Sequence, residues 1–311
     1  MKKGINVFSG FDGISCCHIG LERAGVEVAS YRASELLMIP KDKKANLKPN
    51  PAVLITQYNY PDTIQLGDIR NIDGTPLKGK IQLMVAGSPC QTFSNAGLRT
   101  GFDGSSGLLL DWVRLKNQIQ PEFFLLENVE MKKEWEDIIS DLLGVPAIHI
   151  NSSLVSSQNR ARVYWTDIPY TPIEDKGIML SDQVLGAICG TNKHGKLVPE
   201  HLRVPGHEGK LVKYKANGWV DMVGAKGCCL VTSRGHYRNI QGKVMGYTPE
   251  DAEGLQTLPL GYTDVPSVCN TDRHRSIGNA WTVDILVEAF FKNLPWASEL
   301  KVQPKDKFLI L

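Results

Sequence analysis

Short apolar runs and amphipathic stretches alternate along the first 170 residues of the chain. Residues 4–8 (GINVF) predict a short buried strand, and a glycine-bearing turn, SGFDG, follows it. The next stretch, ISCCHIGLERAG, places apolar residues at helical spacing and predicts a helix that stops at Gly25. VEVASYRASE predicts a second strand, which ends in an acid, Glu35. This order of strand, glycine turn, helix and strand is the opening unit of a doubly wound α/β fold.

The same alternation continues to about residue 170. Helical periodicity marks residues 51–58, LLLDWVRLKNQI at 108–119 and WEDIISDLLG at 135–144. Apolar runs mark strands in IQLMVAGSP, EFFLLENV and AIHINSSLV, and LGDI predicts the end of another strand. Strands that alternate with helices form a mainly parallel sheet, so we expect an α/β first domain over residues 1–170.

The pattern changes after Pro169. Residues 171–245 are rich in glycine and basic residues, and short β-like runs such as KLVKYK and CCLVTS predict a small domain of strands and loops. Helical signals return from residue 246. Thr248 is a predicted N-cap before Pro249, and WTVDILVEAFFKNL is a predicted amphipathic helix. We expect residues 246–311 to rejoin the first domain.

Positive charge is concentrated in the second predicted domain. The formal net charge of the 311 residues is only +2, yet residues 176–243 contain 11 Lys and Arg against four acids, together with four of the seven histidines. Such an excess is typical either of a solvated basic face or of a surface that contacts phosphates. Charge alone does not separate the two.

Several classes of protein are disfavoured by the composition. No apolar run approaches the roughly 20 residues that a membrane helix needs. The N-terminus reaches glycine and aspartate too early for a signal peptide. Seven cysteines, with adjacent pairs at 16–17 and 228–229, suit neither a disulfide framework nor a metal site. We therefore expect a cytoplasmic protein with reduced thiols, no membrane contact and no metal.

Two acids and the first glycine turn predict a nucleoside ligand. Glycines after a strand let the backbone approach a ligand at the carboxyl edge of the sheet, and an acid about 20 residues further on binds ribose hydroxyls. Glu35 has that spacing, and Asp68 is a candidate for an adenine amino group. Because the full GxGxxG pattern is absent, the ligand is better matched by S-adenosylmethionine than by a dinucleotide.

Two other predicted strand ends carry reactive side chains. Cys90, in GSPCQ, is either a core cysteine or a nucleophilic thiolate. Pro89 stiffens the turn before it, and a polar loop with several glycines follows, able to move over a ligand. Glu127, which with Asn128 follows the apolar run FFLL, is either a surface acid that opens a helix or a partly desolvated carboxyl able to donate a proton.

A third polar group lies in SSQNRARVYW. Gln158, Arg160 and Arg162 alternate there, so on one strand they share a face. Two arginines and a glutamine on one face suit a base, a phosphate and a carboxylate together. The alternative is an exposed polar strand face.

The order of these motifs resembles the cytosine-5 DNA methyltransferase family, in its small bacterial or phage form. GSPCQ, ENV and QxRxR follow one another between an FxGxxG turn and SIGNAWTVDIL, and SGLLLDWVRL and YTPEDAEGLQTLPLGYTD agree with the pattern. The resemblance covers about residues 4–169 and 246–291, and the basic segment 171–245 lies where this family carries its target-recognition domain. The (Asp/Asn/Ser)-Pro-Pro-(Tyr/Phe) motif of amino-methyltransferases is absent.

The resemblance implies transfer of a methyl group from S-adenosyl-L-methionine to carbon 5 of a flipped-out cytosine in duplex DNA, with S-adenosyl-L-homocysteine as product. It implies that the Cys90 thiolate adds to carbon 6 and that Glu127 contacts nitrogen 3. Arg162 is expected to hold oxygen 2 of the base and to orient Glu127. Gln158 and Arg160 are expected to support this arrangement and the DNA backbone.

The resemblance also assigns residues to the cofactor and to DNA. The loop 91–106 is expected to close over the flipped base, and Ser233–Asn239 is the expected sequence-reading loop. The cofactor-binding positions are Phe8, Ser9, Gly10, Phe11, Gly13, Glu35, Leu36, Asp68, Ile69, Pro89, Leu108, Asn279 and Ala280. The DNA-contacting positions are Gln91, Ser94, Asn128, Ser233, Arg234, Tyr237 and Arg238. A monomer on double-stranded DNA is implied, and a cognate restriction endonuclease is the partner if the role is restriction–modification.

One segment departs from the family pattern. LLMIPKDKKANLKP, residues 36–49, intervenes between Glu35 and the next helix, an insertion of about a dozen residues. We expect a surface loop beside the adenosine site, which makes stacking by Leu36 less certain than the other cofactor contacts. The alternatives are altered cofactor affinity, recruitment of a partner, or space for a modified cofactor.

Two other functions stay open. A transfer-RNA cytosine-5 methyltransferase shares the same catalytic core, although the basic segment favours DNA. A catalytically silent DNA-binding homologue is the second, and the presence of Cys90, Glu127 and Arg162 argues against it.

Overall fold

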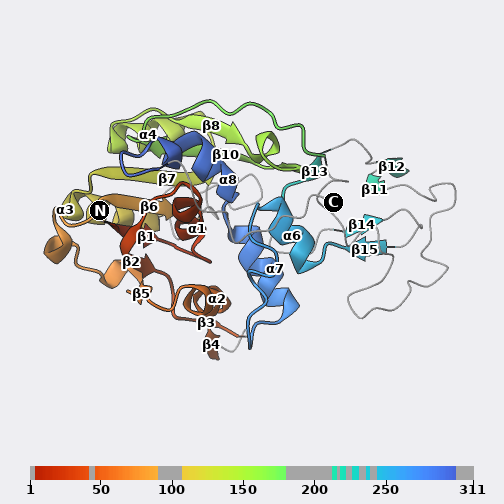
Figure 1. Cartoon of the computed structure of the whole chain (residues 1–311), viewed down its shortest axis with the longest axis horizontal. Coiled ribbons are helices and arrows are strands. Elements are labelled where there is room, and N and C mark those ends of the chain that lie inside the picture. The colour runs from red at the N-terminus through yellow and green to blue at the C-terminus, as the bar shows by residue number, and fades with distance from the viewer. Residues whose placement is uncertain are drawn as a thin grey trace. The chain divides into compact units, whose positions relative to one another are not determined.

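The computed structural model describes residues 4–41, 46–89, 107–179, 212–215, 218–221, 226–230, 236–238 and 244–298. The chain divides into two compact units, whose elements are labelled in Figure 1. The first unit comprises residues 1–151, 161–172 and 283–304, and the second comprises residues 152–160, 173–282 and 305–311. No helix in these described ranges is long and apolar enough to cross a membrane.

The first unit is built on a seven-stranded sheet. From one edge to the other its strands are β5 (Ile64–Gln65), β2 (Val28–Ser34), β1 (Ile5–Gly10), β6 (Leu83–Gly87), β7 (Phe123–Val129), β10 (Ala161–Thr166) and β8 (Ile148–Asn151). The first five pair in parallel, whereas β10 is antiparallel to both β7 and β8. The predicted α/β class with a mainly parallel sheet is confirmed.

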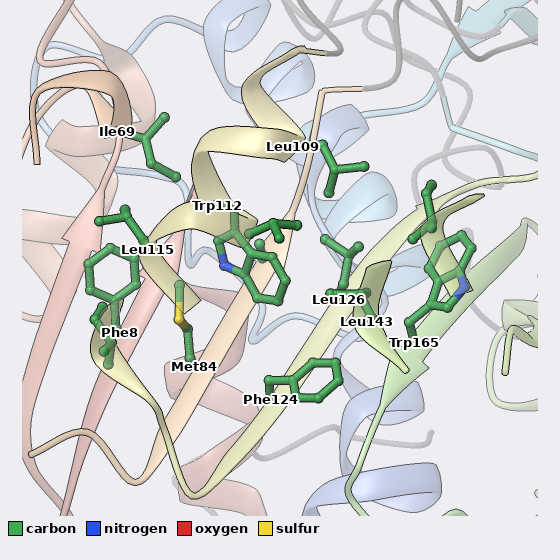
Figure 2. Close-up of a cluster of buried hydrophobic side chains, with 14 of the residues drawn as sticks. Phe8, Ile69, Met84, Leu109, Trp112, Leu115, Phe124, Leu126, Leu143 and Trp165 are labelled. Atoms are coloured by element: carbon green, nitrogen blue, oxygen red, sulfur yellow. The ribbon is translucent and has the colours of Figure 1, made fainter. Parts of the chain in front are cut away.

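Helices cover both faces of this sheet. They are α1 (Cys16–Arg23), α2 (Pro51–Asn59), α3 (Leu108–Ile119), α4 (Lys133–Leu143) and α8 (Val283–Ile285), which a π turn (Leu286–Phe290) and a 3-10 turn (Phe291–Asn293) continue. Successive strand residues point to opposite faces. On one face Phe8 and Leu126 pack in a buried cluster with Trp112 of α3 (Figure 2). On the other face the rings of Tyr164 and Phe290 lie 5.3 Å apart.

Local sequence sets several helix ends. The Asn50 side chain accepts a hydrogen bond from the Ala52 amide at 3.1 Å and caps α2, with Pro51 at the first helical position. Gly144, with φ 70°, ends α4 as predicted, because this left-handed conformation is unstrained for glycine.

The described residues of the segment 36–49 include two strands that pair as the arms of a β-hairpin. β3 (Met38–Pro40) pairs antiparallel with β4 (Leu47–Pro49). Leu36, Leu37, Met38 and Leu47 are 44–60% exposed, so the expected surface position is confirmed. At the base of the hairpin the Asn50 amide donates to the Leu37 carbonyl at 2.9 Å, which closes it with a backbone bond.

The second unit contains a four-stranded sheet in the order β12 (Gly218–Asp221), β11 (Val212–Lys215), β14 (His236–Arg238) and β15 (Val244–Gly246). It also contains α6 (Pro249–Leu255) and α7 (Asn270–Asn279). The Thr248 side chain and the Asp251 carboxylate each accept a hydrogen bond from the other residue's amide, so the predicted cap of α6 is confirmed. Residues 236–238 of the expected sequence-reading loop are a strand.

Three predicted elements are wrong in detail. The strand expected over 147–155 ends at Asn151, and a 3-10 turn, Ser152–Leu154, follows it. The long helix after Trp281 is the irregular α8 segment. LGDI is not a strand end, because Asp68 accepts from the Arg70 amide at 3.0 Å and caps the 3-10 turn Ile69–Asn71.

The strand expected to carry the Gln158–Arg162 alternation is split. β9 (Gln158–Asn159) pairs in parallel with β13 (Gly227–Cys228), whereas β10 starts at Ala161 and joins the seven-stranded sheet. The cause is that Arg160, between the two strands, is 4% exposed and hydrogen-bonds backbone carbonyls of the second unit.

The core packing predicts unequal effects of one substitution at two positions of α3. Leu115 is fully buried, and Leu110 is 45% exposed. Leu115→Ala is expected to lower the free energy of unfolding by about 2–5 kcal/mol, because it removes packed methyl groups and leaves a cavity. Leu110→Ala is expected to change it by less than about 0.5 kcal/mol. Urea unfolding of both variants measures this, and equal losses would contradict the packing described.

Candidate active site

The turn after β1 is open toward solvent on one side and held by acids on the other. Phe11 and Gly13 have positive φ angles of 52° and 59°. Among the residues that the structure describes, none comes within 4 Å of a Cβ atom built at Gly13, so the backbone is accessible to them there. The Gly13 amide donates to Glu35 Oε2 at 3.1 Å, which fixes the turn against the end of β2.

Glu35 directly follows β2 and is tied by three hydrogen bonds. Its Oε1 accepts from the Leu36 amide at 3.1 Å and from Asn50 Nδ2 at 3.2 Å, and its Oε2 accepts from Gly13. Burial raises the pKa of this carboxyl, and these hydrogen bonds oppose the rise. The carboxylate is therefore held where the sequence predicts a ribose-binding acid.

Asp12 is a residue of this turn that the sequence analysis missed. Its Oδ1 accepts from the Tyr31 hydroxyl at 2.7 Å, and its Oδ2 accepts from Ser15 Oγ at 2.5 Å. Burial raises the pKa of the Asp12 carboxyl. The signal available in the sequence was an acid placed between the glycines of SGFDG.

Several predicted cofactor positions belong to the core beneath the turn. Phe8, Ser9 and Ile69 are at most 3% exposed, and a Cβ at Gly10 would lie 2.9 Å from Trp112 Cδ1. Trp112 Nε1 is buried without a hydrogen-bond partner in the part of the chain that the structure describes. Leu36 is 45% exposed, whereas Pro89 and Leu108 are half-buried.

Asp68 lies at the surface and already has a partner. Both of its carboxylate oxygens accept hydrogen bonds from the Arg70 guanidinium, at 2.5–3.1 Å, and this pairing lowers the pKa of Asp68. The Arg70 side chain is 63% exposed. Because an exposed ion pair contributes little, a ligand amino group can compete for the Asp68 carboxylate.

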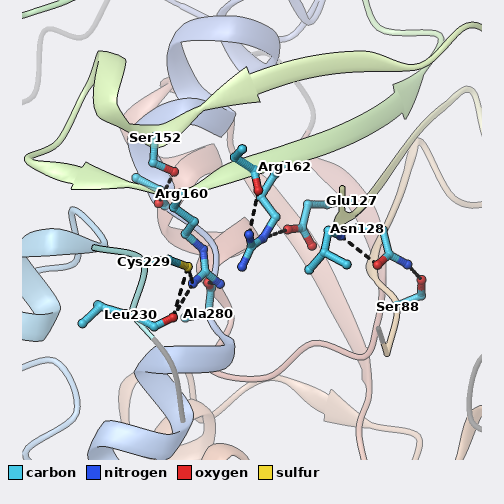
Figure 3. Close-up of polar contacts among 12 residues, drawn as sticks. Ser88, Glu127, Asn128, Ser152, Arg160, Arg162, Cys229, Leu230 and Ala280 are labelled. Carbon is cyan, nitrogen blue, oxygen red and sulfur yellow. Dashed lines mark hydrogen bonds and ion pairs between the residues drawn. The ribbon is translucent and has the colours of Figure 1, made fainter. Parts of the chain in front are cut away.

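Glu127 and Arg162 form an ion pair between adjacent strands. Arg162 Nε lies 2.9 Å from Glu127 Oε1, and the two side chains are 14% and 9% exposed (Figure 3). Arg162 Nη1 also donates to the Ala161 carbonyl at 2.7 Å. Glu127 is a residue of β7 and not a surface acid that opens a helix. The structure thus brings together two of the predicted catalytic residues.

The sheet register brings the segment that leads to Cys90 beside this pair. Gly87, at the end of β6, pairs with Glu127 of β7. Asn128 Nδ2 donates to Ser88 Oγ at 2.8 Å, and both residues are buried (Figure 3). Asn128 is 1% exposed and its amide holds Ser88, whereas its contact with DNA stays a prediction.

Five predicted residues lie outside the described part of the chain. They are Cys90, Gln91, Ser94, Ser233 and Arg234. The whole loop 91–106 also lies outside the described residues. Tyr237 and Arg238 belong to β14 of the second unit. Ser88 was missed by the sequence analysis, although its place directly before Pro89 and Cys90 was visible there.

Gln158 and Arg160 are buried in the second unit. Arg160 Nη1 donates to the Leu230 carbonyl at 3.0 Å, and its Nη2 donates to the Ala280 carbonyl at 3.0 Å (Figure 3). Gln158 Oε1 accepts from the Leu230 amide at 2.7 Å. Neither side chain is more than 4% exposed, and the expected support of the catalytic arrangement and the DNA backbone stays a prediction.

Arg160 instead fixes the predicted cofactor segment at the end of α7. The Ala280 carbonyl accepts from Arg160 and also from Gln256 Nε2 at 2.9 Å. Asn279, the last residue of α7, is exposed beside this anchored carbonyl. Gln256 was missed, because no local sequence signal distinguishes it from other polar residues of a helix end.

The fold is that of solved methyltransferases. A methyltransferase of Entamoeba histolytica, EhMeth, aligns with a TM-score of 0.62 over 92% of this chain and 97% of its own, at 14% identity. Spodoptera frugiperda DNMT2 aligns with a TM-score of 0.61 over 92% of this chain and 98% of its own, at 15% identity. At these identities the likeness concerns the fold alone.

Sequence comparison finds a match to one family and to several of its named enzymes. Residues 4–143 match the C-5 cytosine-specific DNA methylase family. The orphan methyltransferase M.Rho11sI of Bacillus phage rho11s is 31% identical over 172 residues, which are 51% of this chain and 32% of that protein. The type II methyltransferase M.NgoBV of Neisseria gonorrhoeae is 36% identical over 132 residues, 41% of this chain and 28% of that protein.

The match to the C-5 cytosine-specific DNA methylase family, whose members use S-adenosylmethionine, covers residues 4–143 of the 311. The aligned part spans about a third of the length of the curated relatives.

The buried Glu35 carboxyl predicts a pH-dependent contribution to stability. In the folded chain the pKa of Glu35 is raised above the ordinary 4.5, so the unfolded chain loses this proton at a lower pH. As the pH rises from about 4.5 through the raised pKa, Glu35 therefore lowers the free energy of unfolding. Relative to the wild-type chain, Glu35→Gln is therefore expected to gain stability from about pH 4.5 upward.

Urea unfolding between about pH 4.5 and 8 measures this difference. Asp73→Asn is the control. The Thr75 amide lowers the pKa of Asp73 from 3.8, so this carboxyl is ionised in both the folded and the unfolded chain over most of that pH range. A Glu35→Gln difference that stays flat, or that falls as the pH rises, would contradict the burial of Glu35.

Proposed function

We propose that this chain methylates carbon 5 of cytosine in a specific duplex DNA sequence, through a covalent adduct with Cys90. The observation that carries the proposal is the Glu127–Arg162 pair, at 2.9 Å, in register with Gly87, three residues before Cys90 in the chain. Carbon 5 of cytosine is a poor nucleophile, and addition of a thiolate to carbon 6 makes it enamine-like. This step needs a group that stabilises the charge developing on the ring.

Glu127 is suited to that task. A carboxyl group that donates its proton to nitrogen 3 of the base neutralises the negative charge that otherwise builds there when the thiolate adds to carbon 6. Arg162 holds Glu127 in one orientation, and a guanidinium with five N–H donors can contact a carboxylate and a base oxygen together. After transfer of the methyl group, a base removes the carbon-5 proton and the Cys90 thiolate leaves, so the enzyme is regenerated.

The residues of the first unit fit S-adenosylmethionine, which supplies an electrophilic methyl group when bound. The supporting observations are the accessible turn at Gly13, the fixed Glu35 carboxylate and the exposed Leu36. Glu35 is proposed to hold the ribose hydroxyls, Asp68 the adenine amino group and Leu36 one face of the adenine. Asn279 and Ala280 are proposed to complete the site.

Residues 1–170 are proposed as the catalytic and cofactor-binding domain and residues 171–245 as the target-recognition domain. Of the segment 246–311, which the sequence predicted to rejoin the first domain, residues 283–304 cluster with the first unit and residues 246–282 with the second. The basic excess of residues 176–243 supports contact with DNA phosphates. Ser233, Arg234, Tyr237 and Arg238 are proposed to read the sequence, and Gln91 and Ser94 to lie near the flipped base.

The names of the relatives support a type II or phage orphan modification enzyme. We propose that it acts as a monomer in the cytoplasm of a bacterial or phage-infected cell. A restriction endonuclease is the proposed partner in the first case.

Incubation with radiolabelled S-adenosylmethionine and either duplex DNA or transfer RNA tests the proposal. Label on carbon 5 of cytosine, within one sequence context of the DNA, is the expected result. Label confined to RNA would support a transfer-RNA methyltransferase instead. Cofactor binding without transfer to either substrate would support a silent DNA-binding homologue, and both outcomes contradict the proposal.

Substitution of the ion pair is expected to slow methyl transfer without unfolding the chain. Glu127→Gln and Arg162→Lys should each lower kcat by about 10²–10³-fold, which is typical for loss of one group that stabilises a developing charge. Arg23→Lys is the matched control, because Arg23 forms a 2.9 Å pair with Asp284 in the same unit. Single-turnover rates measure the effect, and near-normal rates for Arg162→Lys would contradict the role of the pair.

A further inference from the structure

The hairpin of residues 36–49 ends on Asn50, a residue with several separate contacts. The Asn50 amide donates to the Leu37 carbonyl at 2.9 Å, and its Nδ2 donates to the Leu36 carbonyl at 2.7 Å. Its Oδ1 accepts from the Ala52 amide at 3.1 Å. Asn50 is 7% exposed, so these contacts are made largely away from solvent. One side chain thus closes the hairpin and caps α2.

The same side chain also contacts Glu35. Asn50 Nδ2 lies 3.2 Å from Glu35 Oε1, which accepts from the Leu36 amide as well. Oε2 accepts from the Gly13 amide at 3.1 Å. An ionised carboxylate offers about four lone-pair sites over its two oxygens. The two donors on Oε1 therefore leave the larger remaining acceptor capacity on Oε2.

We propose that Asn50 is a positioning residue for the Glu35 carboxylate, which it holds in the orientation that accepts the ribose hydroxyls of the cofactor. This inference rests on the proposed function. It gives the hairpin a defined task, because the base of the insertion and the ribose-binding acid are fixed by one buried amide. Binding of the cofactor ribose is then coupled to closure of the hairpin base.

Asn50→Ser separates this role from helix capping. Serine keeps an oxygen that caps α2 and lacks an amide donor that reaches Glu35. Asn50→Asp keeps a capping oxygen and also lacks the donor, so it protects the test against a folding defect of the serine variant. The matched control is Asn293→Ser, because Asn293 Nδ2 donates to the Pro169 and Ala289 carbonyls elsewhere in the first unit.

Calorimetric titration of the full chain with S-adenosylhomocysteine and with its 2′,3′-dideoxyribose analogue tests the proposal. Both Asn50 variants are expected to bind S-adenosylhomocysteine about tenfold more weakly, as for loss of one hydrogen bond to a charged group. Their affinity for the dideoxy analogue should equal that of the wild-type chain. Asn293→Ser should bind both ligands normally, and thermal melting should show all three variants folded.

Two results would overturn the assignment of Asn50. One is unchanged binding of S-adenosylhomocysteine by folded Asn50 variants, and the other is an equal loss for the two ligands, which would indicate a general disturbance of the pocket. The wild-type chain shows whether the proposed function itself fails. If it binds S-adenosylhomocysteine but does not methylate DNA, the proposed function is contradicted, and the binding comparison still tests the role of Asn50. No binding by the wild-type chain would overturn both.

Discussion

The candidate active site depends on one ion pair, Glu127–Arg162, formed across two antiparallel strands of an otherwise mostly parallel sheet. Removing two charges from water costs more than their attraction usually returns, so a pair of this kind is weak evidence for a contribution to stability. Its importance is geometric. A guanidinium that contacts the carboxylate of the next strand fixes where the acid lies, and both side chains are nearly excluded from solvent.

The antiparallel strand β10 makes this arrangement possible. Its register sets Arg162 opposite Val129, two residues beyond Glu127, at the carboxyl end of β7. The same end of the sheet carries Glu35 after β2 and the Ser88 hydroxyl after β6. Immediately before β10 the chain is anchored in the second unit through Gln158 and Arg160. Residues 158–162 thus contain side chains of both units. Gln158 and Arg160 are buried in the second unit, and Arg162 belongs to the candidate site of the first.

Local patterns predicted most of the first unit because they need no knowledge of distant contacts. The range of α3, the end of α4 at Gly144 and the cap at Thr248 each follow from periodicity or from one side chain. Glu35 was found by its spacing of about 20 residues from the first glycine turn, and Glu127 was found because it directly follows the apolar run FFLL.

What the sequence did not reveal depends on contacts between residues far apart in the chain. The break at Arg160 follows from hydrogen bonds to carbonyls 70 and 120 residues away. Asn128 was interpreted as a DNA contact because its burial against Ser88 arises only once β6 and β7 pair. Asn50 was not singled out in the sequence, because its contact with Glu35 requires the hairpin to fold back.

The most direct test of covalent methyl transfer uses duplex DNA in which the target cytosine is replaced by 5-fluorocytosine. Fluorine cannot leave as a proton does, so after methyl transfer the Cys90 adduct is expected to persist as a protein–DNA complex that survives denaturing electrophoresis. Cys90→Ser should bind the same DNA and form no such complex. A wild-type chain that methylates ordinary DNA yet traps nothing, or a serine variant that traps as well as the wild type, would contradict the account.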